Sequence, residues 1–135
     1  MGKSTKPGTT IALGAALMAL GIALGAFGAH GLEARVTSER LDTWNTGVLY
    51  HLVHALALVI VGVLSSVVPS LPLRWTHRLF IAGIALFSGS LYLLVLLDMG
   101  PLGAVTPFGG VSFIAAWIAL ARAATGLNPT SQERT

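Results

Sequence analysis

Two histidines, His51 and His54, lie inside a long apolar run, where an ionisable side chain is costly. Their three-residue spacing places both on one face of a helix. Such residues commonly mark functional sites, and histidine titrates near neutral pH, so the pair could form a polar pocket or a proton-responsive site. Alternatively, a neutral His54 hydrogen-bonds Ser88 or a backbone carbonyl and joins two helices. We favour this structural interpretation.

The same histidines make poor metal or haem ligands. Bis-histidine haem needs two histidines on facing helices at one depth, whereas His51 and His54 share a helix and His30 lies near the surface. No carboxylate lies at the level of the pair, the HExxH zinc-protease motif is absent, and the chain has no cysteine. We therefore expect no metal, no cofactor and no catalytic residue, and we expect that the protein is not an enzyme.

The second of four long apolar runs carries this pair. Of the 135 residues, 54% are hydrophobic and only 10% are charged, whereas soluble domains carry about a quarter charged residues. A membrane-spanning helix needs about 20 apolar residues. The sequence thus predicts an all-α, integral membrane four-helix bundle. We expect spans at about 10–28, 46–68, 77–97 and 107–123, with disordered tails at 1–9 and 125–135.

The basic residues orient the bundle. With four spans, both tails and the turn near Pro69–Arg78 share one side, which holds six of the eight lysines and arginines. By the positive-inside rule, both termini lie in the cytoplasm, or in the matrix if the membrane is mitochondrial. Because the basic residues lie at the ends of the runs, they indicate topology, and we expect no nucleic-acid partner.

Polar residues of all four spans are predicted in the outer half of the bundle. At 1.5 Å per residue, His51 lies at the level of Ser90 and His54 at the level of Ser88. We expect the following residues to converge there: His30, His51, His54, Ser88, Ser90, Tyr92, Asp98 and Thr106.

Small residues repeat along the spans and let helix backbones approach closely. The expected packing positions are Gly14, Gly21, Gly25, Gly28, Gly89, Gly109 and Gly110. In the first span this face could form a dimer or pack within the chain, and we favour packing within the chain. The first run also has a cleavage-like Ala26-Phe27-Gly28 signature, but we expect it to stay as an uncleaved span.

Four motifs in order resemble a known family. They are Gly25-Ala26-Phe27-Gly28-Ala29-His30, Trp44-x-x-Gly47-x-x-Tyr50-x-x-x-His54, Phe87-Ser88-Gly89-Ser90-Leu91-Tyr92, and Thr106-Pro107-x-Gly109-Gly110-x-x-Phe113 with Trp117. Together, over about 11–122, they resemble the YgdD-like family of small multi-spanning bacterial inner-membrane proteins, which has small eukaryotic transmembrane relatives. The resemblance implies a multi-pass protein of unknown function. His30 and His54 fall on motif positions, whereas His51 does not.

The short loops and small-residue faces suggest a non-enzymatic accessory subunit or assembly factor, with protein partners in the bilayer or as a homo-oligomer. The alternative is a small oligomeric channel or transporter with a His/Ser pathway, which would need a hydrated cavity reaching these residues. A third interpretation, an enzyme acting on a lipid or quinone, would require a pocket open to lipid near His54.

Overall fold

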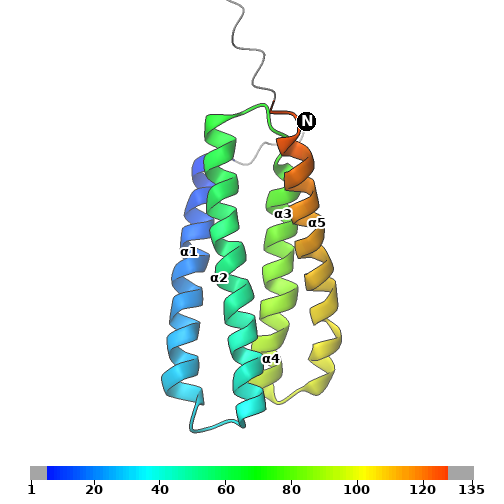
Figure 1. The fold of residues 1–135 in the computed structure, drawn as a ribbon. Coiled ribbons are helices and arrows are strands. Elements are labelled where there is room, and N and C mark those ends of the chain that lie inside the picture. Colours follow the sequence, from blue (N-terminus) through cyan, green and yellow to red (C-terminus); the bar gives the residue numbers. More distant parts are fainter. Residues whose placement is uncertain (1–5, 128–135) are drawn as a thin grey trace, which may run out of the picture.

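The structure is a computed structural model that describes residues 6–127. Its helices are α1 (Pro7–Phe27), α2 (Ser38–Val67), α3 (Arg74–Gly83), α4 (Gly89–Leu97) and α5 (Thr106–Ala124). Short turns extend or join them, namely the π-helices η1 (Gly28–Leu32) and η2 (Ile84–Ser88) and the 3-10 helix η3 (Gly100–Ala104). Because α3, η2 and α4 are continuous, the described chain forms four rods (Figure 1). Each is long and apolar enough to span a membrane, which confirms the predicted all-α membrane bundle.

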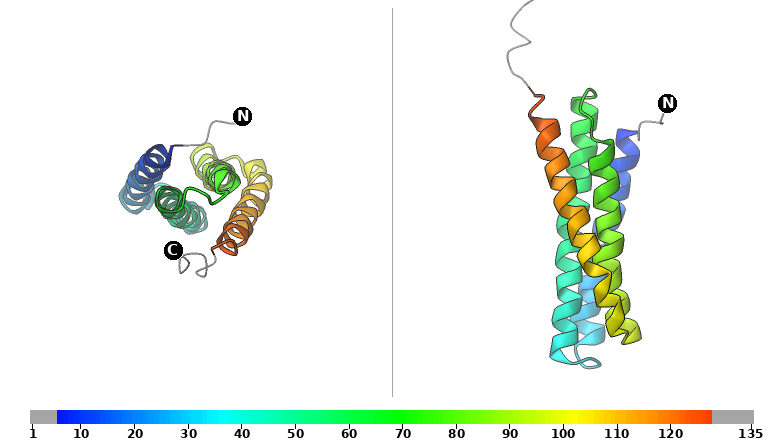
Figure 2. Two further views of the ribbon diagram at one scale, coloured as in Figure 1. Left: turned by 90° about the horizontal axis from the view of Figure 1, so that it is seen from above. Right: turned by 90° about the vertical axis from the view of Figure 1, so that its right-hand side faces the viewer.

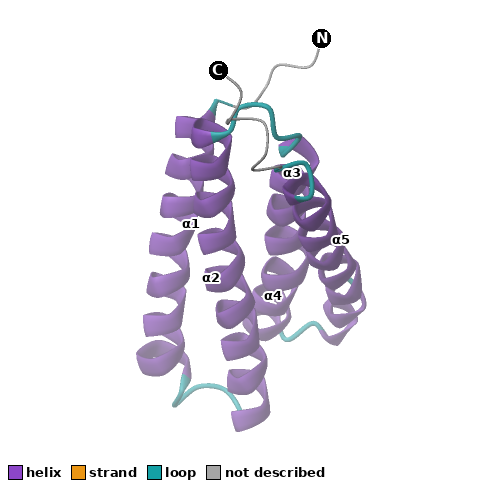
Figure 3. Cartoon of the chain, turned by 45° about the horizontal axis from the view of Figure 1, so that its top comes forward, coloured by secondary structure: helices purple, strands orange, loops and turns teal. Residues whose placement is uncertain are grey.

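The rods form two antiparallel hairpins, α1–α2 and α4–α5 (Figure 3). Seen from above, α1 and α5 lie on opposite sides, with α2 and the α3–α4 rod between them (Figure 2). α1 packs chiefly on α2, whereas α2 also packs on η2 and α4, and α5 packs on α3 and η2. α1 begins and α5 ends at the same end of the bundle (Figure 1). Because α1 packs chiefly on α2, this outer helix has one main neighbour.

Glycines set the closest helix approaches. A Cβ at Gly14 would lie 2.8 Å from the backbone nitrogen of Val59, and one at Gly62 would lie 2.9 Å from that of Ile11. These reciprocal gaps let α1 and α2 pack backbone to backbone. On the other side, a Cβ at Gly109 would collide with the backbone of Phe87, and one at Gly83 with the ring of Phe113. Gly62 and Gly83 were not among the expected packing positions.

The other expected packing glycines differ in how closely they are approached. A Cβ at Gly21 would lie 2.7 Å from Leu52, and one at Gly28 would lie 2.7 Å from Trp44. Gly25 has a looser contact, at 3.3 Å from Val48. Gly89 and Gly110 have no approach nearer than 3.8 Å, so neither position requires glycine for packing.

Two of the rods contain a widened turn. In the third rod, the Gly89 N–H donates to the Ile84 carbonyl, five residues back, which is the π-helical pattern. This turn brings the Phe87 backbone against Gly109 of α5. A π-turn rotates the residues that follow it relative to a regular α-helix. It therefore decides which side chains of the third rod face each neighbour.

The second rod begins earlier than expected. α2 starts at Ser38, where Thr37 caps it by accepting a hydrogen bond from the Arg40 N–H at 3.3 Å. The segment from 38 to 45 is thus helix, because polar residues extend a helix beyond the hydrocarbon core. At 1.5 Å per residue, the 30 residues of α2 measure about 45 Å, longer than a core of about 30 Å.

The other boundaries also shift outward. α1 starts at Pro7, inside the expected tail, because proline suits the first turn of a helix. The third rod starts at Arg74, three residues before the expected span. The expected tails fall largely on residues 1–5 and 128–135, which lie outside the described part of the chain.

Candidate functional site

His54 is held by two hydrogen bonds that define its protonation. Its Nδ1 lies 2.7 Å from the Tyr50 carbonyl oxygen, one turn earlier on α2. Its Nε2 lies 3.2 Å from Nε1 of Trp117 on α5. A carbonyl only accepts and an indole N–H only donates, so His54 donates through Nδ1 and accepts through Nε2. The ring is therefore a neutral imidazole that joins α2 to α5.

Aromatic rings enclose the same histidine. The Phe113 ring stacks on it with ring centroids 3.5 Å apart and planes 10° apart. Tyr50, Phe80 and Trp117 lie around it, with centroids within 6.2 Å. The side chain is buried, and both ring nitrogens are already occupied. The expected partner Ser88 is not bonded to it, and the carbonyl that it bonds belongs to its own helix, so Trp117 supplies the hydrogen bond to another helix.

His51 contacts a different helix. Its Nδ1 lies 3.1 Å from the hydroxyl oxygen of Tyr92 on α4, and not against Ser90 as the depth estimate suggested. Its Nε2 is buried without a hydrogen-bond partner in the described structure. The ring lies beside Gly21 of α1, where a Cβ would be 3.4 Å from it. His51, on the second rod, thus contacts the first and third rods.

Ser90 forms a third polar contact. It donates to the Phe87 carbonyl at 2.9 Å and lies 2.8 Å from the Thr106 hydroxyl. A serine hydroxyl has one proton, so Thr106 donates to Ser90. This pair ties α4 to the first turn of α5. Ser88, in η2, is fully buried, and its hydroxyl has no partner among the described residues.

The remaining candidates lie at the end of the bundle. Asp98, which has a left-handed backbone (φ 52°), pairs with Arg40 at 2.6 Å and so links the end of α4 to the start of α2. His30 lies exposed in η1 and takes part in none of these contacts. The expected cluster is therefore not a single pocket. It is a set of separate links, each between different elements.

Sequence reasoning missed several partners in these links. Trp117 was identified only as a motif residue, and Arg40 was not among the expected residues. Trp44 donates its indole N–H to the Leu24 carbonyl of α1 at 2.9 Å and is fully buried. Two of these three are tryptophans, and a buried tryptophan N–H needs an acceptor, which is the signal that could have found them.

Two cavities reach the histidines, and both are lined mainly by apolar side chains. One, of about 290 Å³, is a groove between α1 and the α3–α4 rod, and His51 and Tyr92 are among the residues that line it. The other, of about 200 Å³, lies beside His54 and is lined by Leu49, Tyr50 and Val53. Within residues 6–127, no three metal-ligating side chains come together. The hydrogen bonds of His54 and His51 join α2 to α5 and to α4.

Comparison with known proteins places the chain among membrane proteins without an assigned activity. It is 48% identical over 115 residues to the UPF0382 membrane protein YwdK of Bacillus subtilis, covering 84% of this chain and 94% of that relative. It is 46% identical to SAB0533 of Staphylococcus aureus and 43% identical to SH2409 of Staphylococcus haemolyticus, both UPF0382 membrane proteins. Each of these two matches covers 82% of this chain and 89% of the relative. No solved structure matches it.

The family comparison agrees with these relatives. A family described as "Protein of unknown function (DUF423)" matches residues 24–110, a stretch that runs from the end of α1 to the start of α5 and includes His51 and His54. The expectation of a small membrane-protein family of unknown function is confirmed at that level. On the family match and the high identity over most of its length, the chain belongs to the DUF423 family of membrane proteins.

Proposed function

We propose that this protein is a non-enzymatic accessory subunit or assembly factor that binds a transmembrane helix of a partner protein. We further propose that it resides in a bacterial inner membrane with both termini in the cytoplasm, and that its family is the YgdD-like one. The excess of basic residues at the end where α1 begins and α5 ends supports the orientation. The naming of the relatives as membrane proteins supports the location.

The groove beside α1 carries the proposal. α1 packs chiefly on α2, so the space between α1 and the α3–α4 rod is open. Leucines of α1 form one wall, and small residues, Ala85 and Gly89, lie on the opposite side. Small residues allow a further helix to approach closely, and leucines supply the contact area. A partner helix in this groove would give α1 a second neighbour.

The polar residues of the spans support a structural role and give less support to a pathway. His54 uses both ring nitrogens within the bundle, and Ser90 and Thr106 bond each other. The cavities beside the histidines are apolar, whereas conduction would need water to reach them. The channel alternative is therefore not favoured.

Site-directed crosslinking tests the proposal. Because the native chain has no cysteine, Leu20→Cys introduces a single thiol in the groove. Ile114→Cys on α5, an aliphatic residue exposed outside the groove, is the matched control. After crosslinking in native membranes, we expect a defined protein adduct from Leu20→Cys that is absent from the control, identified by mass spectrometry.

Two other outcomes would count against a partner helix in the groove. If both cysteines crosslink only to lipid, and to the same extent, the proposal is contradicted. If the adduct contains two copies of this chain, the groove is occupied by a second copy in a homo-oligomer and not by a separate partner protein.

A further inference from the structure

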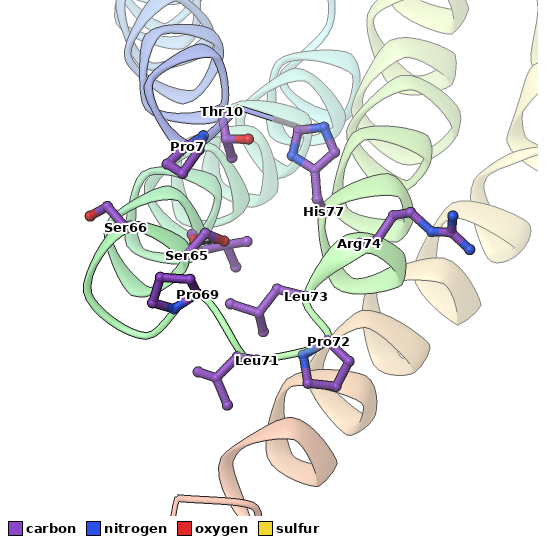
Figure 4. Close-up of a pocket in the computed structure, with 11 residues that line it drawn as sticks. Pro7, Thr10, Ser65, Ser66, Pro69, Leu71, Pro72, Leu73, Arg74 and His77 are labelled. Carbon is purple, nitrogen blue, oxygen red and sulfur yellow. Dashed lines mark hydrogen bonds between the residues drawn. The ribbon is translucent and has the colours of Figure 1, made fainter. Parts of the chain in front are cut away.

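A third, more polar cavity lies at the end of the bundle where α1 and α3 begin and α2 ends. Its volume is about 530 Å³, and residues from all three helices and the α2–α3 turn line it (Figure 4). Among them are Thr10 of α1, Ser65 and Ser66 of α2, and His77 of α3. The proposed partner groove and the helix-joining contacts described above do not use this cavity.

His77 supplies a buried and unpaired ring nitrogen there. Only 8% of the residue is exposed, and its Nδ1 has no hydrogen-bond partner among the described residues. Thr10, 3% exposed, faces His77 across the space between α1 and α3 (Figure 4). A buried polar atom without a partner is costly, so a ligand that completes its hydrogen bonding would bind favourably.

Two helix N-termini adjoin the same space. α1 begins after Lys6 and α3 after Leu73, and neither N-cap residue provides a side-chain cap. At α3 the first backbone N–H groups have no partner within the helix and carry partial positive charge, which favours an anion. α1 contributes less, because Pro7 has no N–H and the Thr9 N–H donates to the Lys6 carbonyl. Ser65 and Ser66 donate their hydroxyl protons to carbonyls of α2, so their hydroxyl oxygens line the cavity without supplying a free donor.

The charged side chains around the cavity are also positive. The charged side chains described at this end are all basic: Lys6, Arg74, Arg78 and Arg122. The carboxylates described in the chain lie at the opposite end: Glu33, Glu39, Asp42 and Asp98. Arg74 and Arg78 lie over the ring of Trp75, at 5.8 and 5.6 Å, an arrangement suited to the membrane interface. An anion at this end would meet complementary charge.

We propose that this end cavity binds an anionic phosphate group, either the headgroup of an anionic phospholipid or free phosphate. His77 Nδ1–H donates to a phosphate oxygen, and the Thr10 hydroxyl and the first N–H groups of α3 contact the others. The basic side chains around the opening attract the anion from the membrane surface.

The test uses the purified full-length protein in a neutral detergent. Native mass spectrometry measures retention of phosphatidylglycerol and of zwitterionic phosphatidylcholine, and thermal unfolding measures the effect of sodium phosphate against sodium chloride at equal ionic strength. His77→Phe removes the donor. His30→Phe makes the same change at an exposed histidine at the opposite end. Thr10→Val removes the second polar group while keeping its shape.

We expect the wild type to retain phosphatidylglycerol preferentially. His77→Phe should weaken this retention by about tenfold, the effect of losing a hydrogen bond to a charged group, and His30→Phe should leave it unchanged. A rise in the unfolding temperature with phosphate alone, lost in His77→Phe, would identify free phosphate as the ligand. If His77→Phe does not fold, Thr10→Val decides in the same way.

Equal retention of both lipids together with no effect of phosphate would overturn the proposal. A preference that is unchanged in His77→Phe, or in Thr10→Val where that variant decides, would overturn it as well.

Discussion

The indole N–H of Trp117 on α5 donates to Nε2 of His54 on α2 across 3.2 Å. These residues lie 63 positions apart and belong to different helical hairpins. Together with the bond from His54 to the Tyr50 carbonyl, the contact leaves neither ring nitrogen of His54 free for chemistry. An ionisable residue inside a membrane span is used here to fasten one hairpin to the other.

Replacing either partner of this pair should destabilise the bundle. His54→Phe leaves the Trp117 N–H without an acceptor, and Trp117→Phe leaves His54 Nε2 without a donor. Each change should lower the free energy of unfolding by about 1–3 kcal/mol, the cost of an unsatisfied buried polar group. Because the double variant removes both polar groups, its loss should be smaller than the sum of the two single losses. Chemical unfolding in mixed micelles measures all three.

Additive losses in that double-mutant cycle would show that the two side chains are not coupled. The contact would then have no role in joining the hairpins.

Neighbouring glycines of α5 should respond oppositely to alanine. A Cβ at Gly109 collides with the Phe87 backbone, which cannot move without disturbing η2, so Gly109→Ala should destabilise by about 1–3 kcal/mol. At Gly110 the nearest atom is 3.8 Å away, so Gly110→Ala should be neutral or stabilise by up to about 1 kcal/mol through helix propensity. Thermal unfolding compares them, and equal effects would show that η2 does not pack on Gly109.

Tyr92→Phe should loosen α4 from α2. It removes the hydroxyl that pairs with His51, so we expect a loss of about 1 kcal/mol in the free energy of unfolding. Tyr50→Phe, at a partly exposed tyrosine on α2, is the control and should change stability little. A Tyr92→Phe protein as stable as the wild type would mean that the His51–Tyr92 contact contributes nothing.

The ion pair at the far end should matter least. Asp98 is 85% exposed and Arg40 31%, so water and salt screen the attraction between them. Arg40→Gln should therefore lower the free energy of unfolding by no more than about 0.5 kcal/mol, less so at high salt. A loss above 2 kcal/mol that persists in 1 M salt would assign this pair a larger role.

Much of the fold follows from the pattern of apolar residues. Four runs long enough to span a membrane predict four helices, and the structure has four such rods in its described part. The ends are harder to predict, because a helix continues past the hydrocarbon core wherever capping permits. Thr37 provides such a cap, and it extends α2 through residues that resemble a polar loop.

Depth along a span was easier to predict than the direction of a side chain. Counting residues placed His54 level with Ser88, but the bond forms with Trp117, and Ser88 lies buried and unpaired. The π-turn at Ile84–Ser88 changes the direction in which the side chains of the third rod point, and no residue type in the sequence indicates this turn. Which polar groups meet therefore depends on backbone geometry that residue spacing does not encode.

His54 is a structural link between α2 and α5, held as a neutral imidazole. The protonation of this ring is measured most directly by nitrogen-15 NMR of the histidine-labelled protein in lipid nanodiscs at neutral pH. The His54 signals are assigned with His54→Phe. The structure predicts a neutral ring with the proton on Nδ1 and with Nε2 accepting a hydrogen bond that is lost in Trp117→Phe. A protonated ring, or a proton on Nε2, would contradict the claim and return His54 to the candidates for a functional site.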